Sequence, residues 1–141
     1  MKEFNSQICT TREQSERLLA LGLKKETADM YYQKLNDKWT PFIGQPLSYD
    51  GLCGTYLIPA WSLSRLLCML TSGIPLSENL PTIDTHAFLR LHTVAVSYEY
   101  DDYDGEERIL VCFNGNGFFA AVVDAIEWLI KEGYFNKEYL V

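Results

Sequence analysis

Residues 108–135 contain a change of hydrophobic pattern that constrains the fold more than any other feature of the sequence. In residues 108–113, both alternate sets are apolar from Ile109 onward, which is typical of a strand covered on both faces and predicts a central strand. After a glycine-rich turn, residues 118–130 place large apolar side chains at three- and four-residue spacings, ahead of Gly133. This spacing predicts an amphipathic helix that ends at the glycine.

Within that helix, Ala121, Ala125 and Trp128 form a second and narrower stripe. Trp128 falls on the side that otherwise carries charged residues, because each residue advances about 100° around the helix. A large aromatic side chain beside two small ones predicts that a second body covers the stripe. That body is either another helix of the same chain or the surface of a partner or second copy, where aromatic anchors are enriched.

The length of 141 residues fits one globular domain over residues 1–141. The four cysteines are widely separated and form no Cys-x-x-Cys pair, which favours reduced thiols in the cytoplasm. The N-terminus has no apolar signal core, and no segment reaches the roughly 20 apolar residues of a membrane span. A net charge of −7 makes nucleic acid an unfavourable partner, since phosphate binding rests on Lys and Arg.

The N-terminal third predicts two helices. The first helix is expected to open at Thr10 or Thr11, where Thr10 and Glu13 have capping-box spacing, and residues 25–35 have the apolar spacing of a second helix. Two helices joined at Gly22 make an αα-hairpin, which is also the outline of a helix-turn-helix. The second helix offers few basic residues, so a nucleic-acid-binding regulator remains an alternative only.

The middle of the chain predicts fewer regular elements. Residues 36–54 are rich in turn formers and predict irregular structure, followed by a short strand and a helix capped by Ser62. Residues 87–100 predict a strand region whose alternation changes phase, which requires a bulge or break, and Asp104-Gly105 predicts a hairpin. The expected fold class is α+β: a small, mainly antiparallel sheet of about three strands packed with about four helices, including the N-terminal αα-hairpin and the C-terminal amphipathic helix.

No motif predicts a catalytic centre. The turn at Gly115, Asn116 and Gly117 resembles part of a dinucleotide fingerprint, but no second parallel strand can follow it, and the remaining interpretation is an anion site at the helix N-terminus. Asp84 and His86 could supply two metal ligands, but no Cys-x-x-Cys or His-x-x-x-His pair is present to complete a site around His86 or His92. No nucleophile elbow is present either. We therefore expect no metal, no cofactor, no catalytic residues and no enzymatic activity.

Three segments, residues 11–23, 58–63 and 125–135, carry a resemblance to small proteins encoded on phages and mobile elements of gut bacteria. That group has no established activity, so the resemblance implies a bacterial cytoplasm and an accessory role but no functional residues. The leading hypothesis is a non-catalytic accessory protein that acts through protein-protein contacts, either by self-association into a homo-oligomer or as an adaptor. A nucleic-acid-binding regulator and a small-molecule or anion binder are the alternatives.

Overall fold

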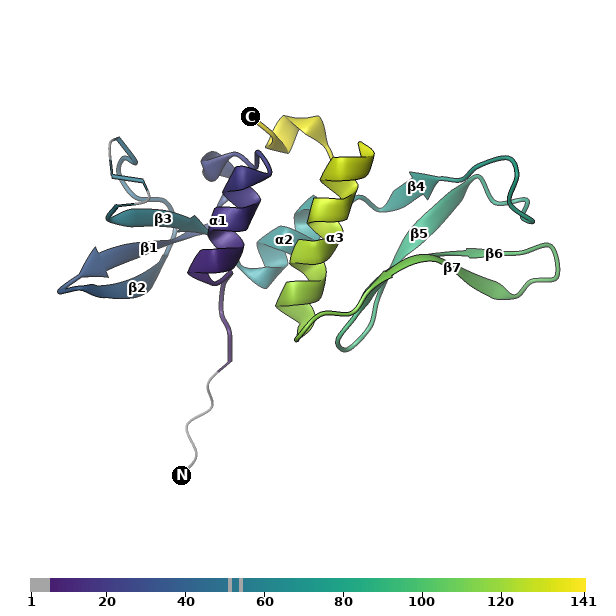
Figure 1. The fold of residues 1–141 in the computed structure, drawn as a ribbon, viewed down its shortest axis with the longest axis horizontal. Coiled ribbons are helices and arrows are strands. Elements are labelled where there is room, and N and C mark those ends of the chain that lie inside the picture. Colours follow the sequence, from purple (N-terminus) through teal and green to yellow (C-terminus); the bar gives the residue numbers. More distant parts are fainter. Residues whose placement is uncertain (1–5, 51, 54) are drawn as a thin grey trace, which may run out of the picture. The chain divides into compact units, whose positions relative to one another are not determined.

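The computed structural model describes residues 6–50, 52–53 and 55–141 (Figure 1). In this part of the chain there are three α-helices, two short 3₁₀ helices and seven strands in two antiparallel sheets. Contacts divide the chain into two compact units. Unit 1 comprises the residues up to Met69 together with Lys137–Val141, and unit 2 comprises Leu70–Asn136. The prediction of a single domain over residues 1–141 stays a prediction.

Unit 1 begins with helix α1, Arg12–Ala20. Thr11 is its N-cap and forms a capping box with Gln14, whose backbone N–H donates to Thr11 Oγ1 over 3.1 Å. The side chain of Gln14 in turn accepts the backbone N–H of Thr11. The capping box is therefore one residue later than Thr10 and Glu13 predicted, because Thr10 is buried and its hydroxyl bonds Ser15 instead.

The sheet of unit 1 has the strand order β2-β1-β3. Its strands are β1 (Met30–Leu35), β2 (Lys38–Ile43) and β3 (Leu57–Ala60). Asn36 and Asp37 join β1 to β2 with positive φ angles of 50° and 61°, which is the conformation of a tight hairpin turn. Helix α2, Leu63–Met69, follows β3, and its predicted cap is confirmed because the Arg65 N–H donates to Ser62 Oγ.

The predicted N-terminal αα-hairpin is wrong. Residues 25–35, expected as its second helix, form the short 3₁₀ helix η1 (Lys25–Thr27) and then strand β1. The pair Tyr31 and Tyr32 fits a strand as well as a helix, and aromatic residues are enriched in strands. What decides the outcome is long-range pairing, because β1 lies in the centre of the sheet and has a partner strand on each side.

Unit 2 is a four-stranded sheet with one helix. Its strands are β4 (Gly73–Pro75), β5 (His86–Leu91), β6 (Val96–Asp101) and β7 (Glu107–Phe113), in the order β4-β5-β6-β7. Helix α3, Phe118–Glu132, packs against β6 and β7, and the strands extend beyond it (Figure 1). The second 3₁₀ helix, η2 (Lys137–Tyr139), belongs to unit 1.

The α+β class and the C-terminal helix are therefore confirmed, but the predicted counts of about three strands and four helices are wrong. Residues 36–54 contain strand β2 where we expected irregular structure. The change of phase in residues 87–100 marks a turn between β5 and β6. A hydrogen bond from the His92 N–H to the Ala95 carbonyl closes this turn. Among the described helices, none is both long and apolar enough to cross a bilayer.

Strand β7 was expected at the centre of the sheet, and it is an edge strand. It also carries a bulge, because Tyr98 pairs with Val111 whereas the next residue, Glu99, pairs with Ile109. The extra residue, Leu110, places Ile109 and Val111 on opposite faces of the sheet. The apolar set on the face that carries Ile109 is therefore not covered, because Ile109 is exposed.

The predicted Asp104-Gly105 hairpin is confirmed, with Gly105 at a φ of 78° between β6 and β7. The carboxylate of Asp102 holds this turn. Its Oδ1 accepts the backbone N–H groups of Asp104 and Glu106, and its Oδ2 accepts Nε of Arg108 over 2.9 Å. The bond from the Glu106 backbone, together with Arg108, lowers the pKa of Asp102 below its ordinary value.

This lowered pKa predicts how the hairpin responds to acid. A group with a depressed folded-state pKa stabilises the fold above its unfolded pKa, and that stabilisation is lost as the pH falls through the folded pKa. We expect the NMR signal of the Asp102 side-chain carboxyl carbon to keep its position until the pH is below the ordinary aspartate value of about 3.9. Asp102→Asn should remove this titration, and a midpoint at or above the ordinary value in the wild type would contradict the assignment.

Candidate functional site

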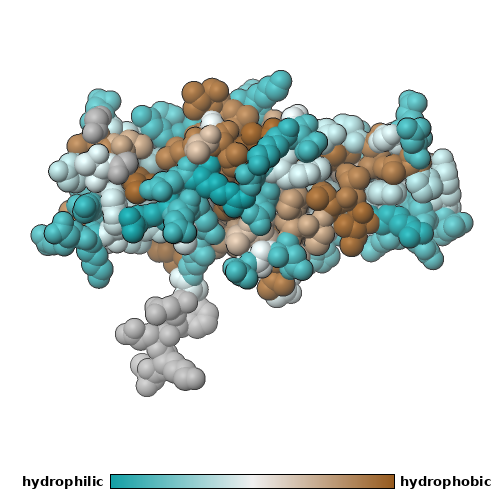
Figure 2. Space-filling view, in the orientation of Figure 1, coloured by the Kyte–Doolittle hydropathy of each residue, from teal (hydrophilic) through white to brown (hydrophobic). Residues whose placement is uncertain are grey.

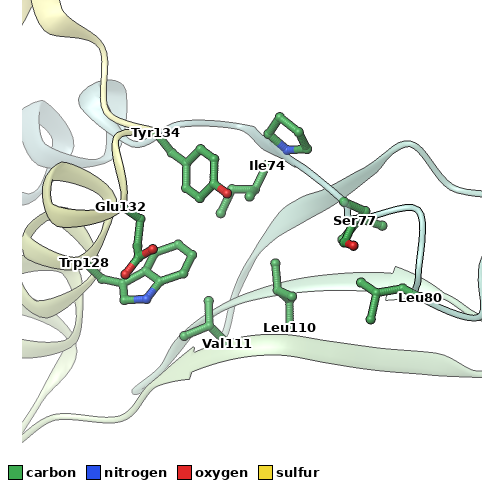
Figure 3. Close-up of a pocket in the computed structure, with 10 residues that line it drawn as sticks. Ile74, Ser77, Leu80, Leu110, Val111, Trp128, Glu132 and Tyr134 are labelled. Atoms are coloured by element: carbon green, nitrogen blue, oxygen red, sulfur yellow. The ribbon is translucent and has the colours of Figure 1, made fainter.

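An apolar groove on unit 2 is the candidate site, and we call it the Trp128 groove (Figure 3). Its volume is about 370 Å³, which lies in the range of binding pockets. Four parts of unit 2 supply its walls: β4, the connection after it, β7 and the C-terminal end of α3. The lining residues are Ile74, Pro75, Leu76, Ser77, Leu80, Leu110, Val111, Trp128, Glu132 and Tyr134.

An aromatic cluster builds the helical wall of the groove. The ring of Trp128 lies 6.3 Å from that of Tyr98, 5.8 Å from that of Phe113 and 5.9 Å from that of Tyr134, measured between centroids. The rings are tilted, which is a favourable arrangement for aromatic pairs at these distances. Trp128 is thus fixed by two strands of the sheet and by the residue that follows the helix.

Backbone contacts hold Tyr134 in this cluster. Gly133 ends α3 in the left-handed conformation at a φ of 80°, and the Tyr134 N–H then bonds the Leu129 carbonyl over 2.8 Å. Thr71 Oγ1 donates to the Tyr134 carbonyl, while the Tyr98 hydroxyl donates to the Thr71 carbonyl, both over 2.7 Å. Burial raises the pKa of Tyr98, so this hydroxyl remains a donor. The wall is therefore preorganised.

The groove is acidic at its mouth. Glu132 is the charged residue among its lining residues, and it lies four residues after Trp128 on α3, so the two side chains are neighbours on the surface of the helix (Figure 3). Glu132 is exposed and has no ion pair within the described residues. A carboxylate beside an aromatic face suits an ammonium or guanidinium group, which is attracted to both.

Unit 2 as a whole is strongly acidic. It contains 11 of the 19 Asp and Glu residues of the chain but only 3 of the 12 Lys and Arg residues. Two of those three are already engaged, since Arg108 pairs with Asp102 and Lys131 with Glu127. Figure 2 shows hydrophobic surface over the strands of unit 2 and hydrophilic surface at the end that carries the hairpin between β6 and β7. The groove is thus an apolar surface on an acidic unit.

The interface candidates Ala121, Ala125 and Trp128 lie on one face of α3. Trp128 contacts side chains of β6 and β7, so helical periodicity places the two alanines on the side of the sheet as well. Both alanines are fully buried, whereas Trp128 is partly exposed in the groove. The body over this stripe is the sheet of the same chain, and the use of these residues as an intermolecular interface stays a prediction.

The candidate anion site at Gly115, Asn116 and Gly117 is the turn that leads into α3. Gly117 is the N-cap residue and has a φ of 98°, a conformation that favours glycine. At Gly115, an added Cβ would lie 2.9 Å from the Cβ of Ala120. Backbone conformation explains the glycine at position 117, and close packing explains the glycine at position 115. Anion binding at this turn stays a prediction.

A polar cluster on the other face of the sheet contains His92, Ser97 and Glu99. The ring atom Nε2 of His92 lies 3.0 Å from Ser97 Oγ and 3.2 Å from Glu99 Oε2, and the Ser97 hydroxyl donates to Glu99 over 2.6 Å. A catalytic triad needs the serine and the acid at opposite ring nitrogens. Here the same ring nitrogen, Nε2, lies near both the serine and the acid, so the cluster is a local hydrogen-bond network and not a triad. The hydrogen bond from Ser97 is the main cause that lowers the pKa of Glu99.

No group of His, Cys, Asp and Glu side chains suited to holding a metal ion occurs among the described residues. Comparison of the chain with protein-family models, curated proteins and solved structures gives no match. We therefore infer function from the geometry of this chain. Of the groove, sequence reasoning identified Trp128 but missed Ile74, Leu80 and Leu110, because nothing in the sequence indicates that β4 and β7 approach the same end of α3.

Proposed function

We propose that unit 2 is a protein-binding module, and that the Trp128 groove takes an apolar side chain from a basic segment of a partner protein. The observation that carries this proposal is an apolar groove, preorganised by the aromatic cluster, with the carboxylate of Glu132 at its mouth. Aromatic anchors in such pockets contribute much of the energy of protein interfaces. This makes the chain a non-catalytic adaptor.

The charge of unit 2 favours a basic partner over a second copy. A homodimer through this unit would bring two acidic surfaces together, and like charges juxtaposed in an interface cost binding energy. A Lys- or Arg-rich segment gains attraction from the same surface and associates faster at low salt. Self-association remains the second candidate, because Trp128 is partly exposed and bordered by apolar residues.

The setting that we propose is the bacterial cytoplasm, with an accessory role for a phage or mobile element. The four cysteines are unpaired, as is usual in a reducing compartment. A nucleic-acid regulator has less support, since its N-terminal helix pair is replaced by a strand. A small-molecule ligand in the Trp128 groove would find few polar groups for orientation.

The proposal predicts a charge-dependent selection. A display library of random short peptides, panned against the wild type, should yield sequences enriched in Lys or Arg next to Leu, Phe or Trp. Glu132→Lys should weaken the selected peptides by about tenfold or more, because it replaces a charge-assisted contact with repulsion. Isothermal titration calorimetry at fixed salt measures the difference.

The matched control is Glu16→Lys, which makes the same change at an exposed helical position of unit 1. We expect this variant to bind the selected peptides within about twofold of the wild type, because Glu16 lies outside the groove. Equal weakening by both variants would mean that only net charge matters. A library that yields no basic and apolar consensus would refute the proposed function.

A further inference from the structure

Strand β7 has the composition of a central strand but the position of an edge strand. From Ile109 to Phe113 it is uninterrupted by a charge, a proline or a glycine, although Ile109 is 62% and Leu110 is 37% exposed. Strands with both alternate sets apolar are normally covered on both faces of the sheet, whereas the face of β7 that carries Ile109 is exposed. On its outer side, β7 has no partner strand among the described residues.

Edge strands of monomeric proteins usually carry devices that prevent pairing, such as charged residues, prolines or bulges. In β7 the charged residues Glu107 and Arg108 stand at its start, and the bulge is at Leu110. The remaining stretch, residues 111–113, is regular and pairs with β6 in continuous register on its inner side. This part of the outer edge is thus available to another strand.

The same strand forms one wall of the Trp128 groove, through Leu110 and Val111. We propose that the partner segment binds in an extended conformation and adds as a fifth strand to the outer edge of β7, with its apolar side chains directed to the groove. The inference rests on the proposed function and names the conformation and sequence pattern of its partner. Backbone hydrogen bonds to the edge would give affinity, and the groove would give specificity.

The chemistry of the two faces defines the pattern of the partner. On the groove face, Val111 and Leu110 offer apolar contacts beside Trp128. On the opposite face, Glu99 lies next to Ile109 in register, and Asp101 lies next to Glu107. Successive residues of a strand point to opposite faces. The segment that fits alternates apolar residues, directed to the groove, with basic residues, directed to these carboxylates.

The probe is a peptide as long as β7, capped at both ends, that alternates Lys and Val around a central Leu. Two methylated versions carry N-methyl groups on the same number of residues, one at the Val and Leu positions and the other at Lys positions. In an added strand, alternate N–H groups point to the same edge, so only one of the two sets faces β7. We expect one version to lose at least about tenfold in affinity and the other to stay within about threefold of the parent peptide.

Loss of binding by both versions would indicate a helical partner, and loss by neither would indicate docking through side chains alone. Either result overturns strand addition while leaving the proposed function in place, provided that binding still depends on Glu132. Failure of the parent peptide to bind, when peptides from the random library do bind, overturns the alternating pattern. If light scattering shows a wild-type dimer that the peptide dissociates, a second copy occupies the edge, and the assignment to a partner protein is overturned.

Discussion

Trp61→Ala should destabilise unit 1 by about 3 to 5 kcal/mol, which is the cost of removing a large aromatic side chain from a core. Trp61 follows β3 and precedes α2 in the sequence, and its side chain is fully buried. Its indole Nε1–H donates to Thr27 Oγ1 over 3.0 Å, and its backbone N–H and carbonyl both bond Thr10. The substitution leaves a cavity and removes the donor to a buried hydroxyl, so both terms act in the same direction.

Urea unfolding measures the loss, and hydrogen exchange at Tyr32 and Ile58 assigns it to the sheet of unit 1. Trp61→Phe keeps most of the buried volume but loses the indole donor, and we expect a smaller cost of about 1 to 2 kcal/mol. The matched control is Trp39→Ala on β2, a partly exposed tryptophan next to Arg12 and Lys34. If Trp39→Ala were as destabilising as Trp61→Ala, the core assignment would be wrong.

Local signals in the sequence predicted the elements whose structure is decided locally. The apolar spacing after Gly117 and the stop at Gly133 define α3, and Ser62 caps α2. Asp104-Gly105 likewise produces the hairpin. Each of these depends on the conformational preference of one or two residues and on a period of 3.6 or 2, so no information from distant parts of the chain is needed.

Elements that depend on distant partners were not predictable in this way. Residues 30–35 carry apolar groups at spacings compatible with either a helix or a strand, and pairing with β2 and β3 decides for a strand. The hairpin turn at Asn36 and Asp37 was read as the start of irregular structure, although both residue types tolerate positive φ. In β7, the sequence correctly indicated an apolar strand but could not show that the outer side lacks a neighbour.

Only part of the Trp128 groove was predictable from the sequence, because its walls come from distant parts of the chain. Trp128 attracted attention because its position on α3 conflicts with a solvated face, which is a local anomaly. The opposite wall comes from β4 and the connection after it, at residues more than 40 positions away. The anomaly therefore located one anchor of the groove, and the tertiary fold supplied the rest.

Trp128→Ala should weaken both the stability of unit 2 and its binding of basic peptides. Trp128 contacts three aromatic rings, so its removal costs about 3 kcal/mol from lost burial and lost ring pairs. Because the same indole lines the groove, binding of the peptides selected from the library should fall by about tenfold or more. Trp128→Phe keeps one ring in the cluster, and we expect it to recover most of the stability but only part of the affinity.

The oligomeric state separates this account from an interface role for Trp128. If Trp128, Ala121 and Ala125 pack on the sheet of their own chain, light scattering at several concentrations should give a monomer for both the wild type and Trp128→Ala, with circular dichroism confirming that both are folded. The variant should then unfold at a lower urea concentration, because the lost contacts lie within one chain. A wild-type oligomer that Trp128→Ala converts into a monomer of unchanged stability would instead make α3 an intermolecular interface, and self-association would replace peptide capture as the function of this surface.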